Sequence, residues 1–150
     1  MLHPDLHFGT PRPSAPQAYL TGNESTNSNS FNNGWYPDSG ATHHVTPDAS
    51  NLMDVSSFSG SDQMYIGNGQ GLTINSISSM SFSSPFSPNT TLTLNNLLHV
   101  PSITKNLVSV SQFCKDNNVF FEFHSNICYV KSQDSSKILL RGHLGDDGLY

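Results

Sequence analysis

The chain has 150 residues, which suits one domain of ordinary size, and its six Lys and Arg against eleven Asp and Glu give a net charge of −5 at pH 7. This balance argues against direct nucleic-acid binding, because a surface that binds phosphates normally shows a basic stripe. No apolar run approaches the roughly 18–20 residues of a membrane span. The sequence does not open with a signal-peptide pattern, and Cys114 and Cys128 are too few for a disulfide framework. We therefore expect an intracellular, reduced protein without membrane contact.

The composition favours short strands over long helices. Only 11% of the residues are charged, whereas Ser, Asn and Thr are abundant and Phe is the most frequent aromatic residue. Residues 1–34 are rich in Pro and then in Asn and Ser, with too few large apolar side chains to offset the entropy of ordering the backbone. This stretch is predicted to be a disordered N-terminal linker.

The first half of the remaining chain predicts a hairpin followed by an irregular strand. Residues 63–74 alternate around a glycine-rich tip at 67–71, which is typical of a hairpin because glycine permits positive φ. The alternation slips near Ser76 and then resumes, which indicates a bulge or a bend. Pro85 and Pro88 mark a loop.

The next segment contains one clear strand and one ambiguous element. Residues 92–100 alternate with a period of two and end at Pro101, as expected of a half-buried strand. Apolar residues at helical spacing predict a short helix over 104–113, although residues 107–110 fit a strand as well.

The last third of the chain predicts a hairpin from residues 119–123 and 127–130, and then a final strand at 138–141. Many short strands with one short helix predict an all-β fold, a small closed or partly open β-barrel.

Residues 38–40 offer a carboxylate beside two small residues. Asp38, Ser39 and Gly40 would let a second chain approach the carboxylate closely. Two carboxylates brought together share one proton, because like charge raises the pKa of one of them. Such a pair can activate water and protonate a substrate carbonyl. On three residues alone a turn is the commoner role, and Pro37 removes a strand donor directly before Asp38.

The wider context resembles the protease region of copia-type retrotransposon Pol polyproteins. Trp-Tyr-Pro-Asp-Ser-Gly-Ala-Thr-His-His (residues 35–44) is similar to the protease motif of that family. Tyr-Ile-Gly-Asn-Gly (65–69) resembles its glycine-rich hairpin, and Leu-Leu-His-Val-Pro (97–101) with Asn-Leu-Val-Ser-Val (106–110) resembles a later signature. The resemblance covers residues 35–150, in order.

This resemblance implies a retropepsin-like barrel whose catalytic residues are Asp38, Ser39 and Gly40. It also implies a mobile flap that covers the substrate, formed by Tyr65, Ile66, Gly67, Asn68 and Gly69. Enzymes of this kind act as homodimers, and a single Asp-Ser-Gly in the chain agrees with one carboxylate from each copy. The expected substrate is the polyprotein itself, with no cofactor and no metal, in the cytoplasm or in the virus-like particle of the parent element.

The same resemblance sets the expected domain limits. Residues 35–131 would form the protease-like β-barrel, and residues 132–150 would begin the segment that precedes integrase. The alternative is a catalytically inactive β-barrel derived from a retrotransposon, which serves as a spacer. It is motivated by the lack of a Cys/His knuckle before residue 35 and of an integrase motif after residue 150.

Three other patterns are weaker. His124 and Cys128 have a spacing compatible with zinc, but two ordinary residues of a hairpin are the better interpretation. Residues 146–148 (Asp-Asp-Gly) read as a turn rather than a second carboxylate loop. The sequence suggests no physical role for His43 or His44.

Overall fold

The computed structural model describes residues 19–21, 34–57, 61–146 and 148–150. The strands in these ranges are β1 (Tyr19–Thr21), β2 (Trp35–Asp38), β3 (Val45–Thr46), β4 (Ser56–Ser57), β5 (Gln63–Tyr65), β6 (Gly71–Thr73), β7 (Ser76–Ser83), β8 (Thr91–His99), β9 (Asn106–Ser109), β10 (Val119–Phe123), β11 (Ile127–Ser132) and β12 (Ile138–His143). The helices in the same ranges are the 3-10 helix η3 (Ala49–Asn51) and the α-helix α1 (Val110–Asn117).

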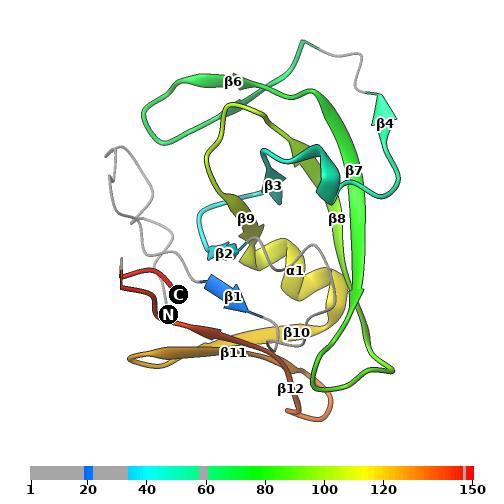
Figure 1. Ribbon diagram of the computed structural model, residues 1–150, viewed down its shortest axis with the longest axis vertical. Helices are drawn as coiled ribbons and strands as arrows, with labels where there is room; N and C mark the ends of the chain where they lie inside the picture. The colour runs from blue at the N-terminus through cyan, green and yellow to red at the C-terminus, as the bar shows by residue number, and fades with distance from the viewer. Residues whose placement is uncertain (1–18, 22–33, 58–60, 147) are drawn as a thin grey trace.

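The described strands form one long curved sheet and one separate hairpin. The sheet has the order β10-β11-β12-β1-β2-β9-β3-β8-β7-β4, and β5 pairs with β6 alone. The sheet bends around α1, and its end strands β10 and β4 do not pair with each other (Figure 1). The predicted all-β fold is confirmed, in the form of a partly open barrel.

The hydrophobic core fills the space between the curved sheet and α1. Trp35 from β2 and Phe113 from α1 are fully buried at its centre. The other members of this cluster come from β7 to β12: Met80, Leu92, Leu94, Leu97, Val108, Val119, Cys128, Val130, Leu139 and Leu140. A smaller cluster of Val45, Leu98 and Val100 lies under the β5–β6 hairpin, where Met64 and Leu72 pack against it.

The predicted hairpins and the predicted irregularity are confirmed. In the β5–β6 hairpin, Gly69 has a φ of 83° and donates its N–H to the carbonyl of Ile66 at 2.8 Å. The β7–β8 register shifts between Ser78 and Met80, opposite Asn96, which has a φ of 54°. This is a β-bulge, close to where the alternation slips in the sequence.

The ambiguous segment holds a strand followed by a helix. The helix predicted over 104–113 is wrong for its first half, because residues 106–109 form β9 and α1 begins at Val110. Ser109 separates the two elements: its backbone is extended, with φ −65° and ψ 112°, and its side chain accepts the N–H of Gln112 as an N-cap. Tertiary pairing of β9 with β2 and β3 decides between two patterns that the sequence left open.

Most of the predicted N-terminal linker lies outside the described residues. Three of its residues, Tyr19–Thr21, form β1, which pairs with β12 and meets β2 at Trp35. Strand β11 runs to Ser132 and pairs with β12, so the sheet continues across the predicted limit at residue 131. The division into domains stays a prediction. Neither helix in the described ranges is long and apolar enough to cross a membrane.

Candidate functional site

The segment around Asp38 is positioned by β9, which lies between the two strands that the loop connects. Residues 39–44, named here the Asp38 loop, lead from β2 to β3. Strand β9 pairs in parallel with β2, with Asp38 opposite Ser109, and antiparallel with β3, with Leu107 opposite Val45. Figure 1 shows β9 beside both strands, with α1 following directly from it. Two segments that are distant in sequence are thereby brought into direct contact.

Asp38 lies at the end of β2 and turns the chain into the loop. Its Oδ1 accepts the N–H of Gly40 at 2.8 Å, and its carbonyl accepts the N–H of Ala41 at 3.4 Å. These bonds form a tight Asx-type turn. Asp38 is partly exposed, and Thr42 and His43 at the tip are exposed. The carboxylate thus sits at a surface that a second chain could reach.

Pro37 is accommodated inside β2. It is buried and lies opposite Val108 of β9. On the other side of β2, the pairing with β1 covers Trp35 alone. Pro37 therefore stands where β2 has one hydrogen-bonded neighbour among the described strands, which is the setting in which a proline is tolerated.

Ser109 and His44 hold the Asp38 loop from beneath. The N–H of Ser109 is donated to Nδ1 of His44 at 3.0 Å, and Oγ of Ser109 donates to the carbonyl of Ala41 at 2.7 Å. Both residues are fully buried. Burial lowers the pKa of His44 from 6.5 to about 4, with Asp116 raising it slightly and His43 lowering it further. His44 is accordingly neutral at pH 7.

A buried polar cluster fixes the strands next to the loop. Oγ1 of Thr46 donates to Oδ1 of Asn106 at 2.6 Å and accepts from Nδ2 of Asn51 at 2.9 Å. Nδ2 of Asn106 donates to the carbonyl of Gly34 at 3.2 Å. These bonds tie the beginning of β2 to β9, β3 and η3.

The predicted flap residues form the tip of the β5–β6 hairpin. Tyr65 ends β5 with 72% of its surface exposed, and the tip residues at 67–70 are exposed. Nearer its base the hairpin packs through Met64 and Leu72 on the Val45 cluster, at the β3 end of the Asp38 loop. In Figure 1 the hairpin lies at the top, apart from the loop between β2 and β3. The role of a flap stays a prediction.

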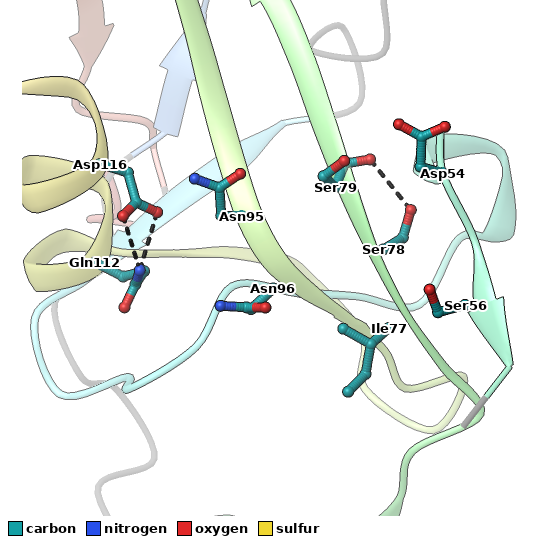
Figure 2. Close-up of a pocket in the computed structure, with 9 residues that line it drawn as sticks. All are labelled: Asp54, Ser56, Ile77, Ser78, Ser79, Asn95, Asn96, Gln112 and Asp116. Atoms are coloured by element: carbon teal, nitrogen blue, oxygen red, sulfur yellow. Dashed lines mark hydrogen bonds between the residues drawn. The ribbon is translucent and has the colours of Figure 1, made fainter. Parts of the chain in front are cut away.

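A polar hollow of about 500 Å³ is lined by residues of α1, β8, β7 and the segment at β4 (Figure 2). Its lining residues are Asp54, Ser56, Ile77, Ser78, Ser79, Asn95, Asn96, Gln112 and Asp116. Nε2 of Gln112 binds both carboxylate oxygens of Asp116, at 3.0 and 2.9 Å. Ligand pockets are usually lined mostly by apolar side chains, and here Ile77 alone is apolar. The hollow includes none of the predicted site residues, and its lining does not indicate a cofactor.

The weaker candidates from the sequence lie apart from this site. Cys128 is buried in the main core, where desolvation raises the pKa of its thiol to about 11. His124 is exposed and its Nε2 lies 2.7 Å from Oε1 of Glu122. In the Asp-Asp-Gly pattern of residues 146–148, Gly148 donates its N–H to the carbonyl of Gly145 at 3.0 Å, as in a turn. Residue 147 lies outside the described residues.

The residues that support Asp38 carry no clear signal in the sequence. His44 and Ser109 lie in two of the segments that carry the resemblance, residues 35–44 and 106–110. Neither segment indicates that the two residues form a hydrogen bond with each other. The buried Thr46 and Asn106 read as ordinary strand residues. A polar residue at an apolar phase of a strand, as Asn106 is before Val108, is the signal that could have suggested a buried network.

Comparison with known proteins gives consistent matches. The family model described as Pol polyprotein, beta-barrel domain, matches residues 35–119. The chain is 38% identical over 115 residues to the retrovirus-related Pol polyprotein from transposon RE1 of Arabidopsis thaliana, which covers 77% of this chain and 8% of that protein. It is 38% identical over 135 residues to the corresponding protein from transposon RE2, covering 90% and 9%. The chain thus spans less than a tenth of these relatives. No solved structure matches it.

Proposed function

The chain belongs to the Pol polyprotein β-barrel domain family, and on this basis we propose that it acts as an aspartic endopeptidase that cleaves its own polyprotein as a homodimer. The observation that carries the proposal is the placement of Asp38 at the end of β2, in a turn held by β9 from within the sheet. A carboxylate that is already fixed at the end of a paired strand can be presented to a second copy at little cost in conformational entropy.

The chemistry requires two copies of Asp38. One carboxylate would take a proton from a water molecule as it attacks the peptide carbonyl, and the other would give its proton to the carbonyl oxygen. Like charge at short distance keeps the pair singly protonated. The partly exposed turn leaves Asp38 accessible to its mate, and the exposed tip of the β5–β6 hairpin would close over the extended substrate.

Peptide cleavage by the purified protein tests this proposal. Peptides that span junctions of the polyprotein are incubated with the wild type and with Asp38→Asn. Asp48→Asn is a matched control, because Oδ1 of Asp48 accepts the N–H of Ser50 at 2.8 Å in the same kind of turn. We expect cleavage by the wild type and the control, and a loss of at least about a thousandfold in Asp38→Asn. Undiminished cleavage by Asp38→Asn refutes the assignment.

The second candidate function is that of an inactive spacer domain. It is favoured by the local hydrogen bond of Asp38, because Gly40 in the same loop already binds Oδ1 and an ordinary turn has the same geometry. Sedimentation separates the two: a chain that stays monomeric at concentrations of about 100 μM cannot pair its aspartates. A dimer that loses cleavage with Asp38→Asn excludes the spacer.

A further inference from the structure

His44 is a polar side chain enclosed in an apolar setting. It has no exposed surface, and the ring of Phe113 stands edge-on to it with the centroids 6.2 Å apart. Its Nδ1 accepts the N–H of Ser109 at 3.0 Å, so the ring proton of the neutral form is on Nε2. Nε2 has no hydrogen-bond partner. Burying the unpaired Nε2–H costs free energy. We therefore expect the remaining hydrogen bond, from the N–H of Ser109 to Nδ1, to be important for holding His44 in this position.

The partner of His44 is the residue at which three elements meet. Ser109 ends β9, stands opposite Asp38 in the parallel register and caps α1, where the N–H of Gln112 reaches its Oγ at 3.3 Å. The same Oγ donates to the carbonyl of Ala41 at 2.7 Å. A displacement of Ser109 would therefore move both ends of the turn, Asp38 through the strand pairing and Ala41 through the hydroxyl.

We propose that His44 is a positioning residue for the Asp38 loop: the neutral imidazole fixes the backbone of Ser109, and Ser109 fixes the turn that carries the carboxylate. The inference rests on the proposed function of Asp38. Protonation would exchange the acceptor at Nδ1 for a donor that faces the N–H of Ser109. The charged and titratable neighbours are His43 in the loop and Asp116 on α1, and burial keeps the ring in the accepting form.

Two substitutions of similar shape, His44→Asn and His44→Leu, distinguish the effect of the hydrogen bond to Ser109 from the effect of packing. In His44→Asn, Oδ1 takes the place of Nδ1 and can accept the same N–H. In His44→Leu, a methyl group takes that place. Hydrogen–deuterium exchange is measured for the amides of Ser109 and residues 40–43. We expect His44→Asn to stay near the wild type and His44→Leu to exchange about tenfold faster, the factor expected for one buried hydrogen bond.

Cleavage of a junction peptide gives the second measurement. We expect kcat to fall about tenfold or more in His44→Leu with little change in KM, and His44→Asn to restore most of kcat. Equal behaviour of the two variants, in exchange and in kcat, overturns the inference. If the wild type cleaves nothing, the proposed function fails. The exchange comparison then still decides whether His44 holds the loop.

A third variant covers the case in which His44→Leu does not fold. Ser109→Ala keeps the N–H that His44 accepts and removes the hydroxyl that binds Ala41. We expect faster exchange at residues 40–43, while the amide of residue 109 stays protected. Unchanged exchange in the loop overturns the inference, because Ser109 would then transmit nothing to the turn.

Discussion

Acid should destabilise this protein through His44. The pKa of the folded protein's His44 is lowered by burial from 6.5 to about 4, whereas the unfolded chain keeps the ordinary value. Below pH 6.5 the unfolded state therefore binds a proton that the folded state does not, and the free energy of unfolding falls as the pH falls. The loss ends near pH 4, where the folded state also binds the proton. A difference of one in pKa corresponds to about 1.4 kcal/mol, so the full loss is about 3 kcal/mol.

Urea unfolding of the wild type and of His44→Asn at pH 7, 6, 5 and 4 measures this loss. The variant has no titrating group at residue 44, so all other acids and bases cancel in the difference between the two curves. We expect the wild type to lose about 3 kcal/mol more than the variant between pH 7 and pH 4. Parallel curves over this range would refute the reasoning, because His44 would then titrate alike in both states.

Two substitutions and one alkylation experiment probe the polar cluster, the core and the buried thiol. Thr46→Val removes the 2.6 Å donor to Asn106, and we expect a loss of about 1–3 kcal/mol in urea unfolding, with Thr46→Ser retaining most of the stability. Leu94→Ala empties a fully buried site and should cost about 2–5 kcal/mol by thermal unfolding, against about 0.5 kcal/mol or less for Val55→Ala at a site that is 59% exposed. The raised thiol pKa of Cys128 should prevent alkylation at pH 8 until urea is added, as counted by mass spectrometry.

The strands that could be predicted are those whose pattern is local. Residues 92–94 alternate because β8 buries Leu92 and Leu94 in the main core, but the alternation breaks at Asn96, after which Leu97 and Leu98 are both buried, in the two different clusters. The glycine-rich tip of the β5–β6 hairpin needs a positive φ at Gly69. Strands β3 and β4 have two residues each, too few for a period to appear. The resemblance to copia-type Pol polyproteins is confirmed by the matches to this family. The order of the strands could not be predicted, since the pairing of β2 with β9 joins segments with no local relation.

The support beneath Asp38 was hidden for a physical reason. Each residue in it has a local role that explains its identity without the others: Ser109 is a good helix N-cap, and Gly40 suits a tight turn. Only the insertion of β9 between β2 and β3 brings Ser109 against His44, 65 residues away in the sequence. Through that contact, residues 35–44 and 106–110, which carry the resemblance, become one hydrogen-bonded unit. A change in the Asn-Leu-Val-Ser-Val segment should therefore alter the Asp38 turn as directly as a change within the turn itself.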